Sequence, residues 1–250
     1  MAKDRTTENH ITATINKDRR RATCKVNLIC IPVALIASFF CPAGIPIWAF
    51  AWFVLFKTAQ QSGSAVLLTG AAGEEKALSV LLRLPDEYTI FNQIQMPDER
   101  SRTGFREADF VVVGPNGIHI IENKDFRGMI VGDEYSYTWE ICKVGRQGTH
   151  YSTSGRNPVR QVQVYVSLLS RILRNRGINA WITPLVSLSQ DNELDQINSK
   201  KVKVVKATDL CNIIQANNRN LTDEAMMKTL DIMEELRVGE LCPGEECQAA

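Results

Sequence analysis

Apolar and polar positions divide the chain into two parts of different character. Residues 26–56 form a run of 31 positions without a single Asp, Glu, Lys or Arg. From residue 73 onward, apolar residues instead recur at the spacings of amphipathic helices and half-buried strands. Because about 18 uncharged apolar residues are enough for a membrane segment, the first part predicts membrane insertion. The second part predicts a folded globular domain.

The uncharged run has an unusual length for a membrane segment. As one helix, its 31 residues would extend roughly 46 Å, more than a hydrocarbon core of about 30 Å, while two spans need about 40 residues. Four residues that interrupt helices lie inside it: Pro32, Pro42, Gly44 and Pro46. Two alternatives therefore stand for residues 26–57, namely one tilted, kinked span or a short hairpin that turns at residues 41–46.

Charge gives this segment an orientation. The chain carries 29 basic and 28 acidic residues, and residues 1–25 alone have a net charge of +4. The uncharged run adds nothing, so the net charge of +1 for the whole chain leaves −3 for residues 57–250. By the positive-inside rule the N-terminus is cytoplasmic. A single span then exports the globular domain, whereas a hairpin returns it to the cytoplasm.

We expect a bacterial-type inner-membrane protein whose globular domain is cytoplasmic. The seven cysteines are odd in number and their spacings form no disulfide framework, which favours reduced thiols. The composition, with 44% apolar and 23% charged residues, excludes a fully disordered chain. The expected organisation is a basic tail (1–25), a membrane segment (26–57), a linker (58–72), a globular domain (73–206), C-terminal helices (207–237) and a flexible tail (238–250).

Periodicity and turn residues predict the elements of the globular part. Helices are expected at residues 74–84, 157–176, 207–216 and 222–236. Strands are expected at residues 88–95, 108–113, 118–122, 135–142, 181–188 and 201–205, with loops at 97–106 and 145–156. This order predicts a mixed α/β domain around a central sheet.

The two strongest strands predict a hairpin that gathers charged residues. Residues 114–117 read Gly-Pro-Asn-Gly, a turn sequence. A hairpin turning there pairs positions whose numbers sum to 231, which sets Asp109 opposite Glu122. Lys124 lies two residues after Glu122 and therefore shares its face. Two carboxylates and one ammonium group are thus expected together among Val and Ile side chains.

Such a cluster is costly to bury unless its members pair with one another or bind a metal. Mg²⁺ prefers oxygen ligands such as carboxylates, and a neighbouring lysine can orient a water molecule or a phosphoryl oxygen. Glu74 adds a further acid, because it shares the apolar face of its helix with Ala77 and Leu81. The alternative is a buried ion pair without a metal.

The same residues carry a resemblance to a known family. The segments 70–74 (GAAGE), 107–117 (EADFVVVGPNG), 120–124 (IIENK) and 157–161 (NPVRQ), with Gly128 and Trp139, resemble the nuclease-related domain, or NERD. That family is placed in the PD-(D/E)XK, or restriction-endonuclease-like, superfamily. The resemblance covers roughly residues 70–173.

The resemblance implies a restriction-endonuclease-like core of order α-β-β-β-α-β and a phosphodiesterase that uses Mg²⁺ or Mn²⁺. Asp109, Glu122 and the Asn123 carbonyl would be metal ligands, and Lys124 would position or activate the attacking water. Glu74 would be an accessory acid, and Gln161 would contact phosphate or support the ligands. The family is also frequently fused to membrane segments.

We therefore expect a membrane-anchored nuclease acting on nucleic acid, DNA rather than RNA. Arg160 stands beside Gln161 and is a candidate to flank the substrate groove, with an ordinary solvated helix face as the alternative. The charge of −3 on residues 57–250 disfavours a tight binding scaffold for phosphates. The rival function is a weak or inactive nuclease-fold module that binds nucleic acid or a protein partner at the membrane.

Overall fold

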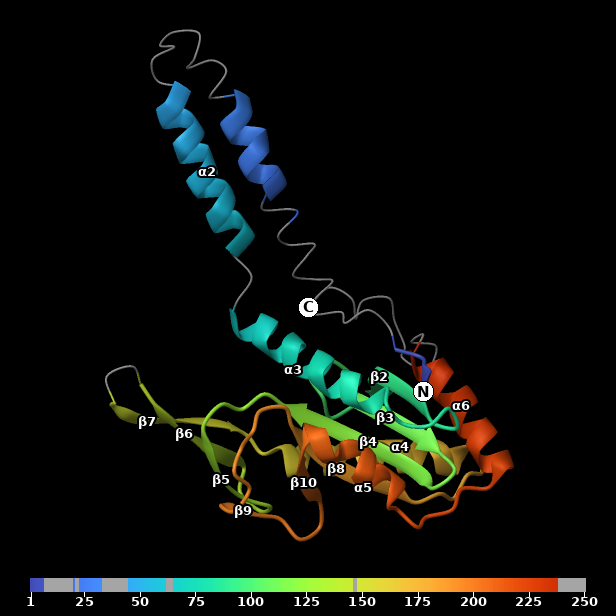
Figure 1. Ribbon diagram of the computed structural model, residues 1–250. Helices are drawn as coiled ribbons and strands as arrows, with labels where there is room; N and C mark the ends of the chain where they lie inside the picture. The colour runs from blue at the N-terminus through green and yellow to red at the C-terminus, as the bar shows by residue number, and fades with distance from the viewer. Residues whose placement is uncertain (7–19, 21–22, 33–44, 62–64, 146–147, 238–250) are drawn as a thin grey trace. The chain divides into compact units, whose positions relative to one another are not determined.

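The computed structural model describes residues 1–6, 20, 23–32, 45–61, 65–145 and 148–237 (Figure 1). The chain forms two compact units. One consists of residues 1–7 together with 72–250, and the other of residues 8–71. The expected flexible tail at 238–250 and most of the basic tail at 1–25 lie outside the described residues.

The larger unit is built on a mixed sheet of six strands in the order β1-β2-β3-β4-β8-β10. The strands are β1 (Lys3–Asp4), β2 (Thr89–Pro97), β3 (Phe105–Gly114), β4 (Gly117–Lys124), β8 (Ile182–Leu188) and β10 (Lys203–Lys206). The pairs β2–β3 and β3–β4 are antiparallel, whereas β1–β2, β4–β8 and β8–β10 are parallel. The prediction of a mixed α/β fold with a mixed sheet is confirmed.

Helices cover both faces of this sheet (Figure 1). On one face, α4 (Pro158–Asn175) and α6 (Asp223–Arg237) pack against Val111 and Ile120 of the sheet in a single apolar core. The other face is covered by α3 (Ala65–Leu81) from residue 72 onward, with η2 (Ala207–Asp209) and α5 (Leu210–Gln215). Burial on both faces explains why β3 and β4 are nearly continuous apolar runs, since a strand covered on both sides need not alternate.

A second sheet of four strands, in the order β7-β6-β5-β9, differs from the prediction. Its strands are β5 (Met129–Asp133), β6 (Thr138–Val144), β7 (His150–Arg156) and β9 (Ile197–Asn198). The loop predicted at residues 145–156 is therefore wrong over its second half. The sequence of β7, HYSTSGR, has no apolar alternation, and its side chains are largely exposed. Backbone pairing with β6 makes it a strand.

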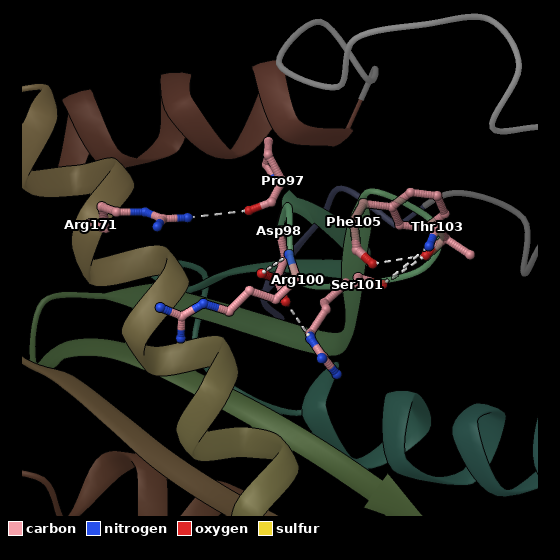
Figure 2. Close-up of polar contacts among 8 residues, drawn as sticks. Pro97, Asp98, Arg100, Ser101, Thr103, Phe105 and Arg171 are labelled. Carbon is pink, nitrogen blue, oxygen red and sulfur yellow. Dashed lines mark hydrogen bonds and ion pairs between the residues drawn. The ribbon is translucent and has the colours of Figure 1, made fainter.

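The turn between β2 and β3 lies within the predicted loop and is tied to the neighbouring helix (Figure 2). Asp98 accepts hydrogen bonds from the Arg100 backbone N–H (3.1 Å) and from Arg106 Nε (2.6 Å). The hydrogen bond from Arg106 lowers the pKa of Asp98. From α4, Arg171 donates to the Pro97 carbonyl oxygen at 3.5 Å. The contact of Arg171 links the C-terminal part of α4 to the end of β2.

The smaller unit contains a helix at residues 23–32 and α2 (Ile45–Gln61). Trp52 Nε1 donates a hydrogen bond to Asn27 Oδ1 at 3.1 Å, which joins the two helices. Within the described parts of the chain, no helix has both the length and the apolar character needed to cross a membrane. The prediction of a spanning segment over residues 26–57 is thus not supported, and its central part, residues 33–44, lies outside the described residues.

Candidate active site

The β3–β4 hairpin has the predicted register and opens at the predicted carboxylates. Its backbone pairs run from Gly114↔Gly117 to Phe110↔Ile121. One position further, the Asn123 backbone N–H donates to Asp109 Oδ2 at 2.7 Å. Meanwhile β4 continues alongside β8, where Glu122 pairs with Val186. The two strands of the hairpin thus diverge at Asp109 and Glu122. There the Asp109 side chain, rather than the backbone of β3, accepts the hydrogen bond from the Asn123 N–H group.

Glu122 and Lys124 lie together on the face of β4 that α4 covers. Glu122 is only 2% exposed, and its Oε1 lies 2.5 Å from Lys124 Nζ. Tyr165 on α4 donates a side-chain hydrogen bond to the same carboxylate. The predicted grouping of Asp109, Glu122 and Lys124 is therefore what the structure displays.

Burial and mutual repulsion disturb the ionisation of this cluster. Burial, followed by the charge of Glu122, raises the pKa of Asp109 well above its usual range. Burial also raises the pKa of Glu122, although the neighbouring Lys124 ammonium partly offsets the increase. For Lys124, burial opposes the charged form, but Glu122 and Asp109 outweigh it and raise its pKa. A single ammonium group leaves the two carboxylates imperfectly neutralised.

The donor set fits a divalent cation. Among the described residues, Glu122 Oε2 and Asn123 Oδ1 are buried polar atoms without a hydrogen-bond partner. A cation beside Asp109 and Glu122 would offset their mutual repulsion, which adds to burial in raising the pKa of Asp109. In the described part of the chain, no group of three or more His, Cys, Asp or Glu residues is placed to hold a metal. Two carboxylates, a backbone carbonyl and water suit Mg²⁺, which keeps several waters.

Glu74 approaches the cluster from α3, on the other side of the sheet. Its charge contributes to the raised pKa values of both Asp109 and Lys124, so it lies within electrostatic reach of them. The preceding Gly73 permits this approach. A Cβ atom at Gly73 would lie 2.9 Å from both Asp125 Cβ and Ser189 Oγ, and this distance is too short for any side chain to be accommodated without a shift. The glycine therefore brings Glu74 to the ends of β4 and β8.

The first turn of α4 is firmly capped, which positions its next residues. The Asn157 side chain accepts from the backbone N–H groups of Val159 and Arg160, and Pro158 occupies the first turn. Asn157 Nδ2 also donates to the carbonyl oxygens of Asp133 (2.9 Å) and Ser136 (2.7 Å). The helix start is thereby tied to the second sheet.

Gln161 and Tyr165 follow on one face of α4. The Gln161 Oε1 atom is buried and lacks a hydrogen-bond partner in the part of the chain that the structure describes. Tyr165, which binds Glu122, was missed by sequence reasoning. Its spacing of four residues from Gln161 was the available signal, because residues four apart share a helix face.

Arg160 is not brought together with the carboxylates. Its guanidinium group lies 4.2 Å from the centre of the Tyr137 ring, and its Nη1 donates to the Tyr135 carbonyl oxygen at 2.9 Å. It lines a pocket of about 320 Å³ with Tyr135, Glu134, Gln163, Val164, Ser167 and Lys201. A contact between Arg160 and substrate stays a prediction, and that contact would be made in this pocket.

The fold is a mixed α/β domain with a buried cluster of two carboxylates and a lysine on its central sheet. The family model described as NERD, nuclease-related domain, matches residues 69–189. The matched region includes Glu74, Asp109, Glu122, Lys124 and Gln161. The match supports the family that the sequence motifs resemble. Neither the curated proteins nor the solved structures include a match to this chain.

Proposed function

We propose that this protein is a Mg²⁺-dependent nuclease with a restriction-endonuclease-like core, which hydrolyses phosphodiester bonds in DNA. The observation that carries the proposal is the convergence of Asp109, Glu122 and Lys124 where β3 and β4 diverge. The match of residues 69–189 to the nuclease-related domain supports it independently of this geometry.

Each residue of the cluster has a distinct role in this proposal. Asp109, Glu122 and the Asn123 carbonyl would hold Mg²⁺ or Mn²⁺. When bound, the cation supplies stabilisation of negative charge on the phosphate and a more acidic water. Lys124, held by Glu122, orients the attacking water or a phosphoryl oxygen.

Three further residues would support the reaction. Tyr165 fixes the orientation of the Glu122 carboxylate through its hydrogen bond. Gln161 has a buried acceptor oxygen on the same helix face and, through its amide N–H₂, can donate to a phosphate. Glu74 adds negative charge near the cluster, which would favour the binding of a cation there.

The rival function is a nuclease-fold module that binds nucleic acid or a protein partner without cleaving. The observation that favours it is the ion pair of 2.5 Å between Lys124 and Glu122. A lysine already paired with a carboxylate can satisfy that carboxylate without a metal. The two functions differ in what Lys124 contributes, so they can be separated by experiment.

Cleavage of supercoiled plasmid and of single-stranded oligonucleotides in Mg²⁺ tests the proposal. We expect cleavage by the wild type, a fall of about 10²–10⁴-fold in Lys124→Ala, and no change in Lys203→Ala. Lys203 is a suitable control because it is an exposed lysine on β10, outside the cluster. Equal inertness of wild type and Lys124→Ala on DNA and RNA substrates would favour the binding module.

We further propose that the protein acts at the cytoplasmic face of a bacterial-type inner membrane, with which it associates through residues 26–57. The support is the uncharged run at residues 26–56 and the basic residues that precede it. DNA on that face is the substrate we expect.

A further inference from the structure

The N-terminal residues fold into the same unit as the proposed active site. Lys3 N–H donates to the Tyr88 carbonyl oxygen at 2.8 Å, and Arg5 N–H donates to the Ile90 carbonyl oxygen at 3.0 Å. These bonds add β1 as a parallel strand beside β2. Ala2 is buried in the core on the α3 side of the sheet. The first residues of the chain are therefore anchored to the larger unit by backbone pairing and by burial.

This pairing constrains the path of the chain around the smaller unit. Residues 1–7 and 72–250 belong to one folded unit, and residues 8–71 form the other. The chain must therefore leave the larger unit after β1 and return to it through α3. A segment that crossed a bilayer once would place β1 and β2 on opposite sides, where they could not pair.

The smaller unit exposes large apolar side chains on both of its helices. Leu28 is 73% exposed and Phe50 is 69% exposed. Other exposed apolar residues of this unit are Ile29, Ile31, Phe53, Val54 and Leu55. Asn27, the only side-chain amide in residues 26–56, accepts the hydrogen bond from Trp52. This contact pairs the Trp52 indole N–H with the Asn27 side-chain carbonyl oxygen, which lowers the cost of placing both in an apolar medium.

Charge and length indicate how deeply this unit can enter lipid. The nearest charged residues on either side of the uncharged run are Lys25 and Lys57. Lys25 lies within the described helical residues 23–32, and Lys57 lies near the end of α2, so both cations are in the halves remote from residues 33–44 in the sequence. The apolar part of α2, residues 45–56, extends roughly 18 Å. That length corresponds to about one leaflet of a hydrocarbon core of about 30 Å.

We propose that the helix at residues 23–32 and α2 (Ile45–Gln61) insert into one leaflet of an anionic lipid bilayer as a re-entrant pair, with the larger unit on one side of the bilayer. The exposed apolar side chains enter the acyl layer, and the flanking basic residues face the anionic headgroups. The proposal deepens the membrane association proposed above and does not rest on nuclease activity. It replaces the single-span alternative.

Trypsin treatment of membrane vesicles from cells that produce the full chain tests the topology. Arg5 and Arg127 are exposed cleavage sites in the first and second segments of the larger unit. We expect peptides ending at both residues from inside-out vesicles and neither from sealed right-side-out vesicles. Release of the two peptides from opposite vesicle orientations would overturn the proposal, because it would mean a single crossing.

Liposome sedimentation of the purified full chain tests the choice of lipid as the partner. With vesicles of phosphatidylglycerol and phosphatidylethanolamine, we expect the wild type to sediment even in 1 M salt. A smaller fraction of the protein should sediment with purely zwitterionic vesicles. Phe53→Asp combined with Leu55→Asp should lower vesicle partition at least ten-fold, while Tyr151→Asp, an exposed site in the other unit, should not.

Two results would contradict lipid insertion. One is a wild type that stays in the supernatant with every vesicle. The other is a stable dimer that the Phe53→Asp and Leu55→Asp changes dissociate without affecting vesicle partition, which would assign the apolar surface to a second copy of the chain. Lys124→Ala should leave topology and partition unchanged, so a failed nuclease proposal is distinguishable from a failed topology.

Discussion

Apolar side chains are usually buried and charged side chains are usually exposed, but two regions of this protein show the reverse, each in a different way. Where β3 and β4 diverge, Asp109, Glu122 and Lys124 bring charge into the interior. In the smaller unit, residues such as Leu28 and Phe50 expose apolar surface. Buried charge and exposed apolar surface are both costly in a soluble fold. In the proposals above, each region has a partner: a cation and phosphate in the first, and lipid in the second.

The largest expected effect comes from removing charge from the interior. Replacing the ion pair by Glu122→Met with Lys124→Met should abolish Mg²⁺-dependent cleavage, because both a metal ligand and the lysine are lost. The free energy of unfolding should stay unchanged or rise by about 1–4 kcal/mol, since buried ion pairs are often no more stable than apolar replacements. Urea unfolding and the plasmid assay measure the two effects. A clear loss of stability would indicate that the pair is structural rather than functional.

A buried group on the opposite face of β4 provides the next comparison. His119 is fully buried, and its Nε2 atom accepts a hydrogen bond from Asn217 Nδ2 at 3.0 Å. Burial lowers the pKa of His119 to about 4. The unfolded chain binds a proton near pH 6.5, whereas the folded protein resists protonation down to about pH 4. This group should therefore destabilise the fold as pH falls through that window, by about 3 kcal/mol at the low end.

The pH dependence of His119 can be isolated with His119→Gln, which keeps a polar group toward Asn217 but does not titrate. The difference in unfolding free energy between wild type and this variant should change between pH 6.5 and pH 4. A difference that is constant over the window would show that His119 is not held neutral by burial.

A pair of glycines on α3 tests how closely this helix must approach the cluster. Gly73→Ala should cost about 1–3 kcal/mol, because the added Cβ would lie 2.9 Å from both Asp125 Cβ and Ser189 Oγ. It should also reduce cleavage, since Glu74 would shift with the helix. Gly70→Ala is the matched control, because its Cβ meets nothing within 4 Å, and it should stabilise the helix by up to about 1 kcal/mol. Thermal melts of the two variants measure their stabilities relative to the wild type. Equal changes in melting temperature would show that close approach at Gly73 is unimportant.

The smallest expected effect on folding lies in the exposed apolar region. Phe53→Asp should change the unfolding free energy of the larger unit by less than about 0.5 kcal/mol, because the side chain is exposed and belongs to the other unit. The same change is expected to weaken lipid binding. The substitution would then affect function without lowering stability, as the double substitution of Glu122 and Lys124 is expected to do. A large loss of stability in detergent-free buffer would mean that Phe53 is buried in solution.

The hairpin at the centre of the site was predictable because its information is local. The turn sequence at residues 114–117 set the register, and the observed pairs follow it from Gly114↔Gly117 onward. The alternation of side chains between the two faces of a strand then placed Asp109, Glu122 and Lys124 on the same face. The grouping followed from register alone, whereas the divergence of the strands at these residues depends on the pairing of β4 with β8.

Features that depend on distant pairing escaped prediction. β7 has exposed, mostly small polar residues and is a strand only through β6. β1 is two residues long and exists only because β2 offers a free edge. The contact of Arg160 with the Tyr137 ring was likewise not predicted, whereas its role at a substrate groove stays a prediction. Such contacts cannot be inferred from local periodicity.

The most direct test of the central claim is a titration of Mn²⁺, followed by its electron paramagnetic resonance signal, into the wild type and into Asp109→Asn combined with Glu122→Gln. We expect the wild type to bind Mn²⁺ at a single site from which Mg²⁺ displaces it. The double variant should lose binding, whereas Lys203→Ala should retain it. A wild type that binds no Mn²⁺, or a double variant that binds it equally well, would contradict the claim that these buried carboxylates form a metal site.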